Sequence, residues 1–177
     1  MVMPPPVRRA ALAVHVITSV GWIGAVVAYL ALGIAAAVSE QPQTVRAAWI
    51  AMELTGWSVI VPLGVLAWIT GLVMSLGTAW GLVRHYWVIF AFALTTVALA
   101  VLLLHMPSVT AAAGVARIAD DATVLQLGGD ILHPALGLLV LVLVAVLNLY
   151  KPRGTTRYGQ RRRASDARAI QSQDHRA

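Results

Sequence analysis

The stretch AALAVHVITSVGWIGAVVAYLALGIAAAV, residues 10–38, decides the fold of this chain. At about 1.5 Å per residue, a helix of this length crosses the roughly 30 Å hydrocarbon core of a membrane. His15 recurs with Ser19 and Trp22 at steps of four and seven residues, so the three side chains share one face of that helix. Because a polar group facing lipid is costly, we predict that this face is turned towards protein.

Composition extends the membrane assignment to the whole chain. The 177 residues are 59% apolar and only 11% charged, and the mean hydropathy is +0.80, which predicts a single integral membrane domain. The chain has no cysteine, which excludes structural disulfides, thiolate metal sites and c-type haem attachment. It also lacks a phosphate-binding glycine loop and a nucleophile elbow, so an enzyme of the soluble type is excluded.

Three further apolar runs follow the first one. Pro42 lies in the polar break SEQPQ. In the second run Pro62 predicts a kink, and Trp57, Gly64 and Gly71 repeat every seven residues as a close-packing seam. The predicted spans of this all-α, four-helix membrane bundle are residues 10–38, 44–77, 85–106 and 131–150; residues 108–130 are the longest connection, helical in part at 108–118, and residues 151–177 form a largely unstructured tail.

Basic residues gather on one side of this four-span arrangement. Both the N-terminal residues 1–9 and the tail carry arginines, whereas Arg46 and Arg117 on the other side are accompanied by acids. By the positive-inside rule both termini are predicted to be cytoplasmic, which places the chain in a bacterial inner membrane. The net charge of +6 comes mainly from the tail. We therefore expect the tail to contact anionic lipid headgroups, and we expect no nucleic-acid partner.

The intramembrane histidines sort into two groups by depth. His105 and His133 lie towards the outer face, while His15 and His85 lie towards the cytoplasmic face. Two neutral imidazoles from facing helices are what a haem b iron needs axially, and a four-helix bundle offers a suitable slot. Gly137, one turn after His133, would leave room for the porphyrin edge. Haem is therefore one prediction for the outer pair, and the inner pair could hold haem in the same way.

Other roles for the same residues stay open. With Glu53, the outer histidines His105 and His133 form a set of metal ligands suited to zinc or copper. Glu53 could instead pair with Arg46 or act as a proton carrier. Simpler structural roles are an interface position for His85, a helix cap for His105, a satisfied first-turn position for His133 and a hydrogen bond from His15 to Ser19 or a carbonyl.

Four segments resemble known membrane families. They are HVITSVGWIGAV at 15–26, AMELTGWSVIVPL at 51–63, SLGTAWGLVRHYWV at 75–88 and LNLYKPRGTTRYG at 147–159. Together they resemble a group of four-span actinobacterial membrane proteins filed as a domain of unknown function. The first segment is also similar to the first helix of the copper-resistance D family and of the membrane-bound protoporphyrinogen oxidases. The latter resemblance implies that His15 is a haem ligand; the further basic and tyrosine positions of that oxidase have no counterpart here.

Three functions follow as hypotheses of different classes. The first is a b-type haem or redox-related protein that uses His15, His105 and His133. The second is a non-catalytic packing subunit or assembly factor, a homo-oligomer or a partner of another membrane protein, docked through Gly64 and Gly71. The third is a small metal or proton transport component that uses the outer cluster.

Overall fold

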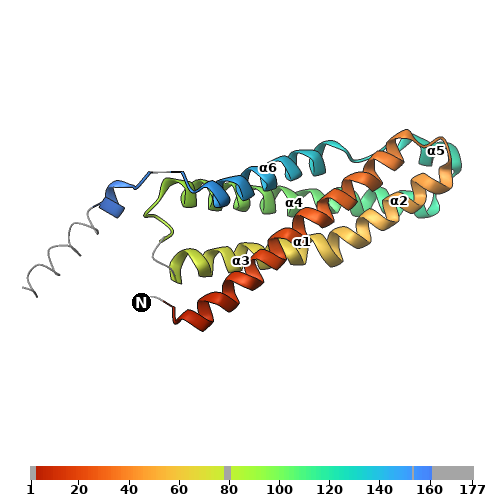
Figure 1. Ribbon diagram of the computed structural model, residues 1–177. Helices are drawn as coiled ribbons and strands as arrows, with labels where there is room; N and C mark the ends of the chain where they lie inside the picture. Colours follow the sequence, from red (N-terminus) through yellow and green to blue (C-terminus); the bar gives the residue numbers. More distant parts are fainter. Residues whose placement is uncertain (1–2, 78–80, 153, 161–177) are drawn as a thin grey trace, which may run out of the picture.

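The computed structural model describes residues 3–77, 81–152 and 154–160. Within these residues the chain is helical, and no β-strand is present apart from one isolated bridge. The elements in order are α1 (Pro5–Val38), α2 (Pro42–Thr55), the π-helix η1 (Gly56–Ile60), α3 (Val61–Gly77), α4 (Tyr86–Ile118), α5 (Asp121–Gln126) and α6 (Leu132–Tyr150), as Figure 1 shows.

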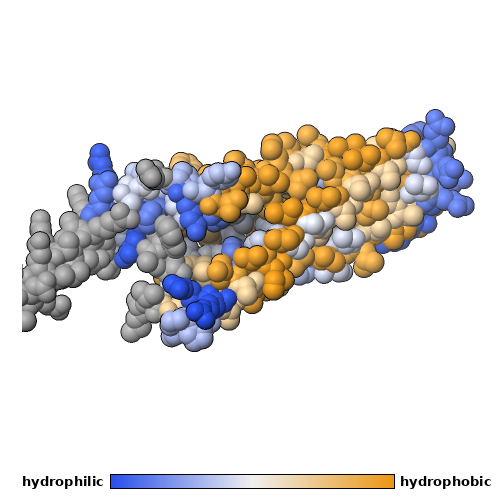
Figure 2. All heavy atoms as spheres, in the orientation of Figure 1, coloured by the Kyte–Doolittle hydropathy of each residue, from blue (hydrophilic) through white to orange (hydrophobic). Residues whose placement is uncertain are grey.

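Four helices are long and apolar enough to cross a membrane. They are α1, the continuous run Pro42–Gly77 formed by α2, η1 and α3, then α4 and α6. Figure 2 shows an apolar band between two hydrophilic ends. Large apolar side chains such as Leu104 and Ile17 point outwards, which fits contact with lipid. The predicted all-α membrane bundle with four spans is confirmed.

The start of α1 and the segment after α6 lie at the opposite end of the bundle from the short helix α5 (Figure 1). We call these the terminal end and the α5 end. Helix α1 packs against α2, α3 and α6, and α4 packs against the same three helices. Of the face predicted to turn towards protein, Trp22 is fully buried and His15 and Ser19 are half-buried. The predicted orientation of α1 is therefore confirmed.

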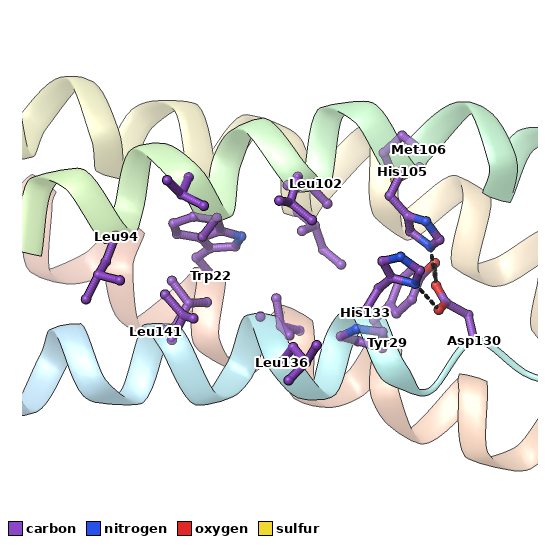
Figure 3. A pocket seen from close by; sticks show the side chains of 18 residues that line it. Trp22, Tyr29, Leu94, Leu102, His105, Met106, Asp130, His133, Leu136 and Leu141 are labelled. Carbon is purple, nitrogen blue, oxygen red and sulfur yellow. Dashed lines mark hydrogen bonds and ion pairs between the residues drawn. The ribbon is translucent and has the colours of Figure 1, made fainter.

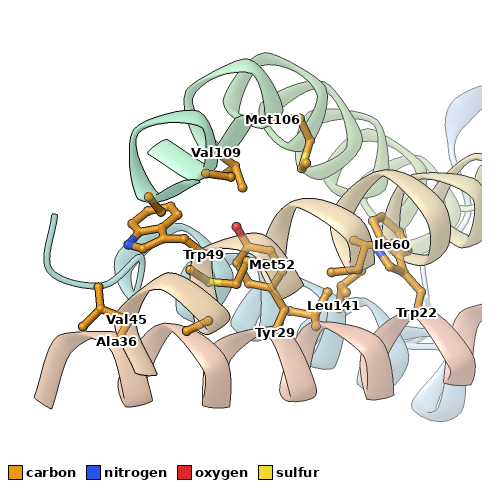
Figure 4. Close-up of a cluster of buried hydrophobic side chains, with 14 of the residues drawn as sticks. Trp22, Tyr29, Ala36, Val45, Trp49, Met52, Ile60, Met106, Val109 and Leu141 are labelled. Atoms are coloured by element: carbon orange, nitrogen blue, oxygen red, sulfur yellow. The ribbon is translucent and has the colours of Figure 1, made fainter. Parts of the chain in front are cut away.

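Small and flexible side chains fill the core at the α5 end. Met52, Met106 and Val109 are completely buried there, and Ala113 and Ala116 are buried beside them (Figure 4). Alanine allows helix axes to come close. In a membrane, where helices gain no hydrophobic free energy by leaving lipid, such close packing stabilises their association. The largest fully buried side chains therefore gather towards the α5 end.

Helix α4 extends beyond the predicted third span. The sequence placed the end of that span at Met106, before Pro107, but the helix continues through the proline to Ile118. Membrane helices tolerate proline where neighbouring structure satisfies the freed carbonyl. The extension carries Arg117 to α2, where its guanidinium pairs with the Glu53 carboxylate. Arg46, considered above as the partner of Glu53, instead donates to the carbonyls of Ala116 and Ala119 at 2.5 and 2.6 Å.

The predicted kink near Pro62 takes the form of a π-turn. In η1 the N–H of Val61 donates to the carbonyl of Gly56, five residues back. The turn sets Gly56 against Met106, where an added Cβ would lie 2.5 Å from the Met106 Cε atom. The predicted close-packing seam of Gly64 and Gly71 is filled by side chains of α1, since Gly64 faces Trp22 and Gly71 faces His15.

The first residues of the tail fold back onto the loop before α4. Thr155 forms an antiparallel bridge with His85, and the N–H of Thr156 donates to the Arg84 carbonyl at 3.0 Å. The structure thus differs from the predicted unstructured tail at residues 154–160. Residues 153 and 161–177, which hold most of the predicted headgroup-binding arginines, lie outside the described residues.

Candidate functional site

A cluster of polar side chains lies inside the bundle towards the α5 end (Figure 3). Its centre is Asp130, directly before α6, whose side chain is only 6% exposed. His105 of α4 contacts Asp130 through Nε2 at 2.6 Å from Oδ2. His133 of α6 places Nδ1 at 3.3 Å from Oδ1, and Tyr29 of α1 donates its hydroxyl to Oδ2 at 3.1 Å. Three helices therefore converge on one carboxylate.

Glycine makes this position of Asp130 possible. A Cβ on Gly33 of α1 would lie 2.1 Å from the backbone oxygen of Asp130, and one on Gly129 would lie 2.0 Å from the Gly33 carbonyl oxygen. Only residues without a side chain permit such an approach of two backbones. Trp49 of α2 ties the same loop down, because its indole N–H donates to the Gly128 carbonyl at 3.0 Å. The loop before α6 is thus locked against α1 and α2.

The bond pattern determines which imidazole nitrogens stay free of protons. A carboxylate only accepts hydrogen bonds, so His105 donates from Nε2, His133 donates from Nδ1 and Tyr29 donates from its hydroxyl. In a neutral imidazole the other nitrogen then carries a lone pair. Those nitrogens are Nδ1 of His105 and Nε2 of His133. The cluster therefore combines one buried carboxylate with two available nitrogen lone pairs.

The two imidazole rings lie flat against each other. Their centroids are 3.6 Å apart and their planes differ by 16°. A haem held between two histidines needs one imidazole on each face of the porphyrin, so these rings would have to separate before a porphyrin could enter. The donor types suit haem iron, but the observed stacking does not, and haem at this pair stays a prediction.

An apolar cavity of about 240 Å³ runs from this cluster towards the middle of the bundle. It lies between α1, α4 and α6, with Trp22 and Leu141 far from the cluster and Leu102 and Leu136 between them (Figure 3). Gly137 lines the cavity, and a Cβ added there would meet nothing within 4 Å. A mostly apolar pocket with a few convergent polar groups is the usual form of a small-molecule site.

The structure brings together part of the predicted outer cluster. His105 and His133 are in contact and Gly137 lines the adjoining cavity, whereas Glu53 pairs with Arg117 instead. Asp130 takes the carboxylate position that the sequence analysis assigned to Glu53. The signal for Asp130 was its place three residues before His133, since its carboxylate reaches that ring across the start of α6. It was missed because residues 108–130 were interpreted as a connection outside the spans.

The predicted inner pair has separate environments. His15 places Nδ1 at 3.0 Å from the Thr70 hydroxyl oxygen of α3, and its ring packs beside Gly71. His85 is buried at the terminal end and forms the bridge with Thr155. These two histidines thus contact different segments of the chain.

Comparisons with known proteins gave no match to a family model, to a curated protein or to a solved structure. The resemblances drawn from the sequence therefore stay predictions, and the site has to be interpreted from its own chemistry.

Proposed function

We propose that this membrane protein binds a divalent transition metal ion, with a preference for Zn²⁺, at His105, Asp130 and His133. One observation carries the proposal. Each of the three residues offers a ligand atom, and these atoms all lie within 4.8 Å of one another. The residues come from α4, the loop before α6 and α6 itself, so the group is assembled by packing and is not a local turn.

The donor set favours zinc over softer ions. Two imidazoles and one carboxylate are ligands that zinc takes in catalytic sites, where three protein ligands leave one position open. Copper(I) prefers thiolate and thioether ligands, but the chain has no cysteine. The sulfur of Met106 packs towards Gly56, in the core. Tyr29, which bonds to Asp130, would orient this carboxylate as an outer partner of the metal.

Charge supports the same assignment. Asp130 is a buried acid in the membrane domain, and its described partners are two histidines and a tyrosine. Buried charges in proteins are paired or coordinate metals. A bound cation would replace the imidazole protons as the partner of the carboxylate, and the ring of His133 is half-exposed.

The proposal is for binding and not for transport along the bundle. Between the cluster and His15 lie the buried side chains of Trp22, Val26 and Ile60. This apolar stretch separates the two polar regions of the bundle. The haem and packing-subunit hypotheses stay open as alternatives, and the experiment below distinguishes haem directly.

Metal content provides the test. Protein purified in mild detergent, stripped with chelator and loaded with Zn²⁺, should retain about one equivalent by mass spectrometry, and Co²⁺ should give visible d–d bands. His105→Ala and Asp130→Asn should each lower affinity at least tenfold. Glu53→Gln and His15→Ala are the matched controls and should bind normally. Equal binding by all variants would exclude this site, and a Soret band in unstripped protein would favour haem.

We further infer that both termini face the cytoplasm. Arg8, Arg9, Arg84 and Lys151 lie at the terminal end, while Arg46 and Arg117 at the α5 end are each paired with an acid. Because the natural chain has no cysteine, single cysteines can report orientation. In intact cells an impermeant maleimide should label Leu125→Cys and not Tyr158→Cys; the opposite pattern would invert the topology.

A further inference from the structure

The cavity beside the cluster has a hydrogen-bond donor at its far end. Trp22 is 3% exposed and lines the cavity. Its Nε1 atom is buried and has no hydrogen-bond partner among the described residues. In Figure 3 the indole nitrogen is on the side of the ring nearer the cluster. An unpaired buried N–H costs free energy, which a ligand atom that accepts its hydrogen bond would recover.

The other end of the cavity accepts hydrogen bonds. Asp130 is a carboxylate, and Nδ1 of His105 and Nε2 of His133 carry lone pairs when the rings are neutral. Aliphatic side chains such as Leu102, Leu136 and Val140 line the space between the two ends. The cavity therefore suits a molecule that presents an acceptor to Trp22 and a hydroxyl to the cluster, with an apolar body between them.

We propose that this cavity binds a membrane-soluble hydroquinone, with one ring oxygen accepting from the Trp22 indole and the opposite hydroxyl donating to the Asp130 cluster. The inference goes beyond the proposed metal site, because it concerns Trp22 and the cavity, and it applies to the metal-free cluster, whose acceptor atoms a bound ion would occupy.

The size of the cavity supports a single ring. A cavity of about 150 Å³ is known to hold benzene, so 240 Å³ accommodates a substituted ring. A fatty acid carries its polar atoms at one end only and would leave either the indole or the cluster without a partner.

Indole NMR signals report the occupant directly. The chain has six tryptophans, and the signal of Trp22 in ¹⁵N-labelled protein in lipid nanodiscs is assigned with Trp22→Phe. Titration with a short-chain alkyl hydroquinone should shift the Trp22 signal saturably. The signal of Trp68, whose indole already donates to the Thr96 hydroxyl, should stay in place. The titration is run on chelator-stripped and on Zn²⁺-loaded protein, so failure of either proposal is seen separately.

Two glycines provide matched variants. An added Cβ meets nothing within 4 Å at either Gly137 or Gly114, but only Gly137 lines the cavity. Gly137→Leu should weaken the titration at least tenfold, and Gly114→Leu should leave it unchanged. No saturable shift of Trp22, equal shifts of all indole signals, or a response to decanoic acid but not to the hydroquinone would each overturn the proposal.

Discussion

His15 and His105 are both histidines inside apolar helices, yet their surroundings differ in kind. His15 meets one hydroxyl, that of Thr70, whose own proton is directed to the Leu66 carbonyl at 2.7 Å. His105 meets a buried carboxylate that also receives His133 and Tyr29, next to a cavity. A histidine satisfied by neighbours on adjacent turns of α3 is accounted for by packing. A carboxylate shared by three donors indicates a site.

The largest difference between the two histidine regions should appear when a methyl group is added to a glycine beside each of them. Gly33→Ala would drive its Cβ into the Asp130 backbone, so α1 and the loop must separate, at about 3 kcal/mol, and metal affinity should fall more than tenfold. At Gly71→Ala the Cβ would lie 3.2 Å from the His15 ring, which shifts slightly, at less than about 1 kcal/mol. Thermal unfolding in detergent measures both. Equal losses would show that Gly33 does not position Asp130.

Removal of the carboxylate should have the next largest effect. Asp130→Leu deletes three hydrogen bonds, and at about 0.6 kcal/mol for each bond within a membrane the expected loss is about 2 kcal/mol. His15→Leu deletes the bond to Thr70 and should cost about 0.6 kcal/mol. Unfolding in mixed detergent micelles compares the two variants. A larger loss at His15 would reverse the ranking of the two regions.

A smaller effect is expected from Tyr29→Phe, which removes one of the three donors to Asp130 and keeps the ring. Outer hydrogen-bond partners of metal ligands typically contribute about tenfold or more to metal affinity, so Zn²⁺ affinity should fall about tenfold with little change in stability. Thr70→Val is the corresponding change beside His15 and should leave Zn²⁺ affinity unaltered. Calorimetric titration of both variants tests this expectation, which an unchanged affinity in Tyr29→Phe would contradict.

The smallest effect concerns α5, outside the spans. The Asp120 side chain caps α5 by accepting the Thr123 N–H at 2.8 Å, and this hydrogen bond holds the pKa of Asp120 below its ordinary value. Because the folded pKa is the lower one, the stabilisation is present above the unfolded pKa and is lost as pH falls through the folded pKa.

The protection factor of the Thr123 amide, which is the intrinsic exchange rate at a given pH divided by the observed rate, should therefore fall on acidification. Asp120→Asn retains a capping oxygen that does not titrate in this range. In that variant the pH dependence of exchange at the Thr123 amide should therefore be the intrinsic one alone. A pH response that is the same in both proteins would show that Asp120 is not the titrating group.

Local sequence properties were sufficient to predict the four membrane spans but not to predict which residues of the site come together. Length and hydropathy identify a membrane helix because lipid leaves the backbone no partners outside its own helix. His105 and His133 were also identified, since polar side chains inside apolar runs stand out. The carboxylate between them was misassigned to Glu53, because contacts between helices leave no regular spacing in the sequence.

The sequence by itself determined four spans, a protein-facing side of α1 and two histidines near one end, since these depend on hydropathy and helical period. Tertiary structure decided which acid joins the histidines. Helix α4 continues through Pro107 and brings Arg117 to Glu53, while Gly33 and Gly129 allow Asp130 to approach α1. Packing also left the Trp22 indole N–H, in a cavity, with no hydrogen-bond partner among the described residues. A sequence does not reveal this, because a hydrogen bond between distant segments exists only after the helices have come together.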